Sequence, residues 1–254
     1  MSGHSKWSQI KRQKGVADAK RGQIFTKLAR EIIIAVREGG SNPEANFRLR
    51  LAVQKARDSN MPLENIERAI KRGSGQTEGT SLVEMVLEGY GPSGAAILVT
   101  ALSDNRNRTL QDVRNIFFRH GGSLGESGCV AWLFDSRGLI TVDTKERDAE
   151  ALALDAIDAG AEDVKVESSY IEIYTKPEEL EKAREALKQK NIPIASAEVS
   201  MVPKTIVQLE EKAALQTLKL LDKLEELDEV QSVSSNADFP DSILEKYQSL
   251  SPAR

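Results

Sequence analysis

The 254-residue sequence has little of the chemistry that most enzymes and metalloproteins use. It contains a single cysteine, Cys129, and two histidines, His4 and His120. One cysteine excludes an internal disulfide framework and a zinc-ribbon spacing, and two histidines leave little for a histidine-based metal site. Because no nucleophile stands with a base in a convergent set, we expect no catalytic residue, no metal, no cofactor and no small-molecule substrate.

The chain also lacks long hydrophobic runs. The longest, over residues 95–102, suits a buried strand and is far shorter than the roughly 20 residues of a membrane span. The first residues have no apolar segment of the kind found in secretory signals. We therefore expect a cytoplasmic protein with no membrane partner, and the composition predicts no particular oligomeric state.

Charge is divided unevenly along the chain. Residues 1–75 hold 16 lysines and arginines against 7 acidic residues, a net charge of +9, whereas the remaining residues sum to −13. Such an asymmetry is typical of a polyanion-binding module joined to a solubilising body. The alternative interpretation is that two solvated surfaces of opposite sign dock on each other.

Hydrophobic periodicity predicts three helices in the basic segment. Apolar residues four apart predict a helix over 17–38, which Gly39 and Gly40 end. Residues 41–43 supply a cap and a first-turn proline for a second helix that reaches about 59. A third helix follows residues 60–62 and stops at Gly73. Three helices with short connections predict a small bundle, after which residues 74–81 have the composition of a linker.

The period changes after the linker. The next segment is expected to contain strands over 81–90 and 95–102, a helix capped by Asp104 that runs to about 120, a glycine loop, and a strand over 129–134. A second segment has the strand-helix-strand-strand-helix-strand order of a ferredoxin-like unit, with its elements at 139–142, 147–159, 164–167, 170–174, 178–190 and 195–202. A leucine-rich helix near 207–227 and a short strand near 230–234 follow.

These elements predict an α+β fold of three domains. The first is an N-terminal three-helix bundle over 1–75, and the other two are α/β sandwiches of ferredoxin-like type. Residues 81–134 alone make a half-covered sheet, whose apolar face needs the helix near 207–227 as its cover. We therefore expect a discontinuous middle domain made of 76–135 and 204–254, with a complete domain over 136–203 inserted into it.

Two groups of residues are candidates for binding nucleic acid. The first starts in a polar N-terminal arm and continues onto the predicted bundle: His4, Lys6, Trp7, Lys11, Arg12, Lys14, Lys20, Arg21, Arg50, Arg57, Arg68, Lys71 and Arg72. Flexible basic side chains follow phosphates, and an indole stacks on an unpaired base. The alternative role for Trp7 is to fasten the arm to the bundle. The second group is Arg106 and Arg108, which oppose the dipole at a helix start and are therefore expected either to bind phosphate or to pair with the acidic body.

Three other features have structural interpretations. Cys129 is expected to be a small buried hydrophobe on a strand, and His120 a cation at the end of a helix. The glycines of residues 121–125 lack the Gly-Lys-Ser/Thr ending of a phosphate-binding loop and precede a strand rather than a helix. We interpret that segment as a turn or a hinge.

Several segments resemble motifs of the YebC/PmpR family. They occur in the family's order and cover nearly the whole chain: residues 1–11 (MSGHSKWSQIK), 60–70 (NMPLENIERAI), 88–92 (EGYGP), 104–109 (DNRNRT) with 113–114 (VR), and 121–125 (GGSLG). The resemblance implies a cytoplasmic three-domain protein that regulates gene expression and is not an enzyme.

The resemblance also implies one of two nucleic-acid partners, promoter DNA or ribosomal RNA. Family members are described as DNA-binding transcriptional regulators, which favours the first partner. Others act on the ribosome, including a mitochondrial relative that activates translation of a cytochrome oxidase subunit, and bacterial members are implicated in relieving stalls at proline-rich stretches. The lack of a clear helix-turn-helix signature and the acidic body favour this alternative, a ribosome-binding translation factor.

The basic arm generates the first prediction. If all six lysines and arginines between residues 6 and 21 contact phosphates, log K against log[salt] should have a slope near −5 on duplex and about −4 on single strands. Neutralising Lys11, Arg12 and Lys14 together should remove about half of that slope, whatever the nucleotide sequence. Fluorescence titration measures it, and an unchanged slope in the triple variant would exclude the arm from the site.

Trp7 should act differently, because stacking needs an unpaired base. Trp7→Ala should weaken binding to looped or single-stranded RNA by about 1–3 kcal/mol and leave binding to duplex DNA nearly unchanged. The same titration against a duplex and an RNA loop tests this. A strong, sequence-selective effect on duplex DNA would instead favour the transcriptional interpretation.

Overall fold

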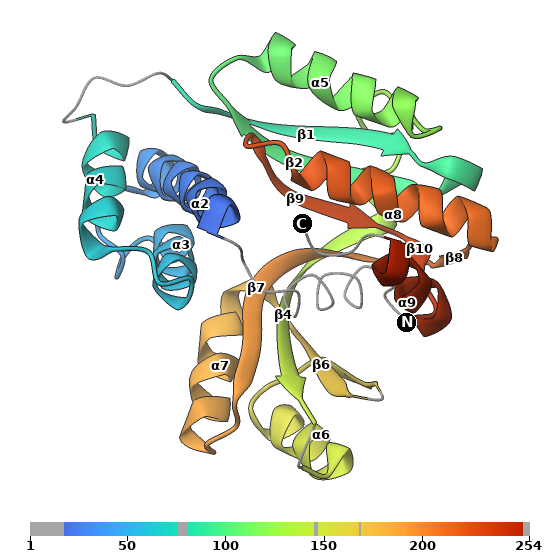
Figure 1. Ribbon diagram of the computed structural model, residues 1–254. Helices are drawn as coiled ribbons and strands as arrows, with labels where there is room; N and C mark the ends of the chain where they lie inside the picture. Colours follow the sequence, from blue (N-terminus) through green and yellow to red (C-terminus); the bar gives the residue numbers. More distant parts are fainter. Residues whose placement is uncertain (1–17, 76–80, 145–146, 168, 251–254) are drawn as a thin grey trace. The chain divides into compact units, whose positions relative to one another are not determined.

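The computed structural model describes residues 18–75, 81–144, 147–167 and 169–250 (Figure 1). The predicted arm and most of the predicted linker lie outside the described residues, and with them six candidate site residues: His4, Lys6, Trp7, Lys11, Arg12 and Lys14. Helices and mainly antiparallel sheets confirm the α+β fold. The described residues form two compact units, one made of 134–202 and the other of the chain on both sides of it.

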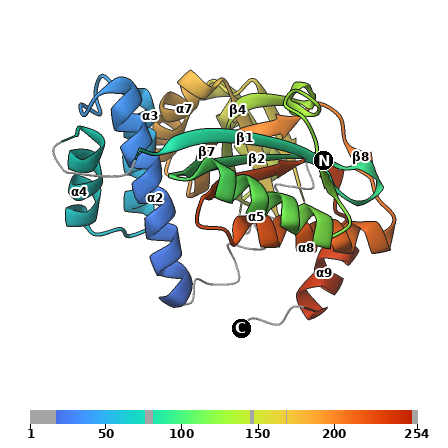
Figure 2. The same ribbon diagram turned by 90° about the horizontal axis from the view of Figure 1, so that it is seen from above.

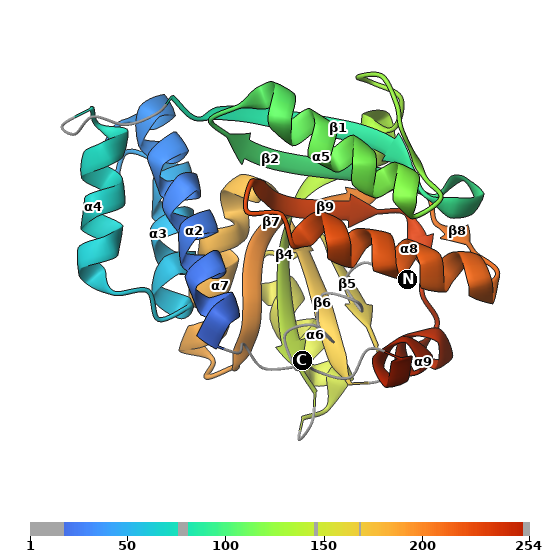
Figure 3. The same cartoon turned by 45° about the horizontal axis from the view of Figure 1, so that its top comes forward.

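The basic segment folds into three helices that lie side by side (Figure 3): α2 (Asp18–Gly39), α3 (Phe47–Asp58) and α4 (Leu63–Gly73). Their apolar stripes meet in one core, formed mainly by Leu28, Ile32, Val36, Leu49, Ala52, Ala56, Met61, Ile66 and Ala69. Gly73 allows α4 to approach α2 closely, since a Cβ there would lie 2.7 Å from Cβ of Val36. The helical prediction from periodicity is confirmed.

The cap of α3 differs from the prediction. The capping residue is Asn46, not one of residues 41–43, and its Oδ1 accepts a hydrogen bond from the backbone N–H of Leu49 at 3.0 Å. Its Nδ2 donates to the carbonyls of Ala35 at 2.6 Å and Gly40 at 2.8 Å. The buried Asn46 amide therefore satisfies backbone groups at the end of α2 and the start of α3 together.

The second part of the larger unit is a four-stranded sheet in the order β3-β1-β2-β9. Its strands are β1 (Val83–Tyr90), β2 (Ala96–Ser103), β3 (Ser123–Leu124) and β9 (Val230–Ser235). The helices α5 (Arg106–Arg119) and α8 (Glu211–Glu225) lie together along this sheet (Figure 2). Side chains such as Ile97, Val99, Phe117 and Leu218 form the core between sheet and helices. Thus α8 supplies the cover that the half-covered sheet requires.

Strand β9 pairs with β2 in antiparallel register, so segments far apart in sequence build the same sheet. After β9 the chain forms β10 (Ala237–Asp238), which pairs in parallel with β8 (Val207–Gln208), and then α9 (Asp241–Leu250). The helix predicted over 207–227 therefore starts only at Glu211, because residues 207–208 belong to a short strand.

Two further sequence expectations are wrong in this part. Asn105, not Asp104, caps α5, because Oδ1 of Asn105 accepts from the N–H of Arg108 at 3.1 Å. Residues 129–134 do not form a strand: a short 3-10 helix spans Ala131–Leu133, and the strand starts at Phe134. The cause is the carboxylate of Glu88, which binds the backbone of this segment and is described below.

The smaller unit has the ferredoxin-like order of elements. It contains β4 (Phe134–Asp143), α6 (Ala149–Asp158), β5 (Asp163–Val166), β6 (Tyr170–Thr175), α7 (Leu180–Gln189) and β7 (Ile194–Pro203). The sheet order is β5-β6-β4-β7, in which β6 separates the two strands that α6 connects. This is the split β-α-β arrangement of that fold. Ile140, Ile171 and Leu187 are among its fully buried side chains.

The points where the chain leaves and re-enters the larger unit are adjacent. The N–H of Lys204 donates to the carbonyl of Leu133 at 2.8 Å. On this basis we propose that residues 76–135 and 204–254 form one domain, into which 136–203 is inserted. Deleting residues 137–203 and joining Ser136 to Lys204 through a short Gly-Ser linker should then leave a folded protein. Circular dichroism and denaturant titration would test this, and loss of a cooperative unfolding transition would contradict it.

Candidate nucleic-acid interface

The lysines and arginines of the helical part divide into two groups. Members of the first are held by carboxylates. Arg48 lies 2.6 Å from Glu38 and 2.9 Å from Glu84, and Lys55 lies 3.6 Å from Glu31. Burial tends to lower the pKa of Arg48, but Glu84 and Glu38 outweigh it and the pKa is raised. These cations are engaged in the structure of the protein.

The second group lies on α4. Arg68, Lys71 and Arg72 are exposed, and their spacing of three and four residues places them close together on the helix surface. No ion pair joins them to an acidic group among the described residues. The two at the end of α4 also suit the helix dipole, which is a sufficient structural role for one cation but not for a cluster of three. The structure thus brings these three predicted site residues together.

The remaining predicted residues of the helices are more scattered. Arg50 donates to the carbonyls of Pro43 and Glu44, both at 3.2 Å, and its guanidinium lies 5.7 Å from the ring centroid of Phe47. Arg57 is exposed in the last turn of α3, and Arg21 is exposed near the start of α2. Lys20 belongs to α2, but its side chain is outside the described residues.

The arginines at the start of α5 differ from each other. Arg108 lies 2.8 Å from Asp104 and 3.1 Å from Glu229, and these carboxylates raise the pKa of Arg108. Arg106 is exposed and has no ion pair within the part of the chain that the structure describes. Arg108 therefore has the acidic partners that one interpretation requires, while a phosphate-binding role for either arginine stays a prediction.

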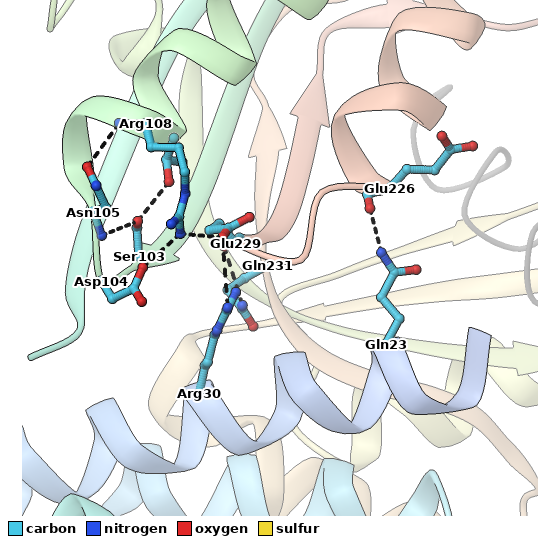
Figure 4. Close-up of polar contacts among 10 residues, drawn as sticks. Gln23, Arg30, Ser103, Asp104, Asn105, Arg108, Glu226, Glu229 and Gln231 are labelled. Carbon is cyan, nitrogen blue, oxygen red and sulfur yellow. Dashed lines mark hydrogen bonds and ion pairs between the residues drawn. The ribbon is translucent and has the colours of Figure 1, made fainter. Parts of the chain in front are cut away.

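Glu229 also faces the helical part, as Figure 4 shows. Nη2 of Arg30 on α2 lies 3.8 Å from Oε1 of Glu229, so Arg30 and Arg108 approach one carboxylate from two helices. Nearby, Lys27 donates to the carbonyl of Glu225 at 2.6 Å and Gln23 to that of Glu226. These carbonyls end α8, where a cation is favoured by the helix dipole. Some of the basic charge therefore docks α2 on the acidic part, as the alternative interpretation of the charge asymmetry proposed.

The residue that sequence reasoning missed is Glu88 on β1. Its carboxylate accepts hydrogen bonds from the backbone N–H groups of Gly128 at 2.6 Å, Val130 at 2.8 Å and Ala131 at 2.7 Å. Burial alone would raise the pKa of Glu88, but the three N–H donors outweigh it and the pKa is lowered. The signal in the sequence was a carboxylate within an apolar strand, followed directly by a glycine. In the structure a Cβ at Gly89 would lie 2.6 Å from the carbonyl oxygen of Ser123, so this position needs glycine. The EGYGP motif therefore shapes the glycine-rich loop.

Exposed aromatic residues lie on the elements that flank the glycine-rich loop. Trp132 is 66% exposed, and its Nε1 donates to the carbonyl of Cys129 at 3.1 Å, which also accepts from the hydroxyl of Tyr90 at 3.0 Å. Phe118 on the neighbouring α5 is 82% exposed. Sequence reasoning placed Trp132 in a predicted strand over 129–134, so its side chain was not recognised as a surface group.

Neither Cys129 nor His120 is activated for chemistry. Burial and the carboxylate of Glu88 raise the pKa of Cys129, which disfavours the thiolate. Burial, together with Lys223 and other nearby cations, lowers the pKa of His120, which disfavours the cation expected from its place at the end of a helix. Within the described residues, no group of three or more His, Cys, Asp or Glu side chains could hold a metal ion, and no helix is long and apolar enough to cross a membrane.

The fold combines a basic helical part with two sheets, each packed with helices. It is therefore a multidomain α+β protein, and one of its helices, α4, exposes a cluster of cations. Models of the "TACO1/YebC protein N-terminal domain" and the "TACO1/YebC second and third domain" match residues 5–76 and 82–237. The chain therefore belongs to the TACO1/YebC family, which confirms the resemblance drawn from its motifs.

Close relatives cover nearly the whole chain. A protein of Dehalococcoides mccartyi named "Probable transcriptional regulatory protein" is 61% identical over 98% of this chain and 99% of its own. A protein of Natranaerobius thermophilus with the same name is 50% identical over 96% of this chain and 99% of its own. The crystal structure of a conserved hypothetical protein from Aquifex aeolicus is 50% identical, with a TM-score of 0.82, and covers 89% of this chain and 94% of that one.

The Glu88 site generates a stability prediction. A lowered pKa stabilises the fold above the ordinary value of 4.5, and that contribution is lost as the pH falls through the pKa of the folded state. Glu88→Gln should cost about 1.5–3 kcal/mol of unfolding free energy at neutral pH, since a neutral amide accepts fewer and weaker hydrogen bonds. The variant should also lose less stability than the native protein on acidification.

Denaturant titration at neutral and acidic pH measures both effects. Glu126→Gln, which changes an exposed carboxylate of the same loop, is the matched control and should follow the native profile. Parallel pH profiles for Glu88→Gln and the native protein would show that the Glu88 carboxylate does not organise the loop.

Proposed function

We propose that this chain is a non-enzymatic cytoplasmic regulator of gene expression, which binds nucleic acid through its basic N-terminal arm and helical domain. The observation that carries the proposal is the exposed cluster of Arg68, Lys71 and Arg72 on α4, which has no ion-pair partners among the described residues. In contrast, Arg48 in the same helical part is bound by two carboxylates. A cluster of exposed cations in a segment of net charge +9 favours a polyanion as the partner.

The names of the relatives support regulation of transcription. For that function we propose promoter DNA as the partner. A helix that reads the major groove presents donors to the bases from its first turns. The first turns of α4 instead expose Glu64 and Glu67, whereas its cations lie toward the end. This observation favours a second candidate function, binding to ribosomal RNA as a translation factor that activates translation or relieves stalling at proline-rich stretches.

Replacing Arg68, Lys71 and Arg72 together by glutamine tests the α4 cluster. If each contacts one phosphate, the slope of log K against log[salt] should fall by about 2.7 on a duplex. In the matched control, glutamine likewise replaces three exposed lysines in or beside α7: Lys182, Lys188 and Lys190. This variant should keep the native slope. Equal losses in the two triple variants would contradict a specific role for α4.

Co-sedimentation with ribosomes in the presence of excess duplex DNA separates the two partners. Because ribosomal clefts offer both phosphates and unpaired bases, a translation factor should remain in the ribosomal pellet. A regulator of promoters should be released by the duplex. Failure to bind either partner at low salt would contradict the proposed function itself.

A further inference from the structure

A cleft of about 390 Å³ lies between α2 and α4. Its apolar lining, called the floor below, includes Phe25 and Ala29 from α2, Met61 from the turn before α4, and Ala69 from α4. Arg68 and Arg72, four residues apart on α4, line the same cleft. An apolar floor beside convergent charged groups is the usual composition of a ligand site, and this volume falls within the range of such sites.

The charges of the cleft favour an anionic ligand. Its lining includes three arginines, Arg30, Arg68 and Arg72, and one carboxylate, Asp104. Asp104 lies 2.8 Å from Arg108, so its charge is already balanced. The buried Nη1 of Arg30 has no hydrogen-bond partner within the described part of the chain, although Nη2 of the same group faces Glu229.

We propose that this cleft binds a single unpaired nucleotide. The base enters the apolar floor and stacks against Phe25 or an arginine plane, while the phosphates on either side of it contact Arg68 and Arg72. Aromatic rings and guanidinium planes are the surfaces on which single-stranded RNA bases stack, and guanidinium groups bind phosphate in a bidentate manner. An acidic peptide would match the charge, but its carboxylates are not joined to a flat ring in the fixed way in which a sugar joins a base to its phosphates.

This inference rests on the proposed function and narrows it to nucleic acid with an accessible base. A base inside a duplex cannot enter the cleft without leaving its stack, which costs free energy. The protein should therefore prefer an RNA hairpin with one bulged adenosine over the same hairpin without the bulge. The preference should be on the order of tenfold, because stacking of one base contributes about that much.

Filling the cleft tests the proposal with the full chain. Ala29→Met places a larger apolar side chain in the floor while keeping a residue that favours helix. It should abolish the preference for the bulged hairpin and leave the affinity for the paired hairpin unchanged. Ala151→Met, at an exposed position of α6, is the matched control and should keep the preference.

A second variant serves if circular dichroism shows that Ala29→Met does not fold. Phe25→Leu removes the aromatic ring but keeps an apolar side chain, and it should reduce the preference by a similar factor. Changing Arg57 to Gln, an exposed cation outside the cleft, should weaken binding of both hairpins alike.

The outcomes distinguish the cleft from the proposed function. Equal binding of the two hairpins by the native protein, or a preference that survives Ala29→Met and Phe25→Leu, would overturn the cleft while nucleic-acid binding stands. Displacement of the bulged hairpin by an acidic, aromatic peptide but not by adenosine monophosphate would assign the cleft to a peptide and overturn the proposal. No binding of any RNA or duplex would overturn the proposed function, and the cleft proposal with it.

Discussion

The pairing of β9 with β2 is the constraint on which the arrangement of the larger unit depends. Val99 pairs with Val233 at the centre of this ladder, so the chain must return to the first sheet after completing the ferredoxin-like unit. The buried side chain of Asn236 reinforces the return by accepting from the N–H of Ala96 at 2.8 Å. Because the chain returns in this way, α8 packs over the sheet. The turn between α8 and β9 is then held in place, and side chains of α2 bind acceptors at this turn.

Contacts at the same turn explain why both interpretations of the charge asymmetry, internal docking and polyanion binding, apply to part of the basic segment. Lys27 and Arg30 bind carbonyls and a carboxylate at this turn, and Arg108 shares that carboxylate. These cations are used within the protein, and they agree with the interpretation of two docked surfaces. The cations of α4 have no such partners among the described residues, which agrees with the interpretation of a polyanion-binding module. Counting charges along the sequence could not separate the two groups, because Lys27, Arg30 and the cations of α4 all belong to the same basic segment.

The sequence predicted elements well where one period covers many residues. The apolar stripe of α2 and the regular order of the ferredoxin-like unit follow from periods of 3.6 and 2, which local sequence carries. The motifs also sufficed to identify the family. Single hydrogen bonds were harder to predict, because Asn46 and Asn105 compete as caps with neighbours of equal propensity, Asn42 and Asp104.

The features closest to function needed long-range contacts. Glu88 binds a loop about 40 residues away in sequence through three backbone hydrogen bonds. These bonds favour a 3-10 helix in a segment where the sequence predicted a strand. The cleft is formed by side chains of α2 and α4 that are about as far apart in the chain. Sequence therefore indicated that Arg68 and Arg72 are candidates for binding, but not that they border an apolar site beside Phe25.

Ultraviolet cross-linking of the full chain to thiouridine-substituted RNA, with the adducts mapped by mass spectrometry, tests the central claim most directly. We propose that nucleic acid binds the helical part through the cations of α4, which have no ion-pair partner among the described residues. We expect adducts on α4, on Phe25 and on the N-terminal arm, with few on residues 134–202. Adducts confined to residues 134–202, with none on α2 or α4, would contradict it.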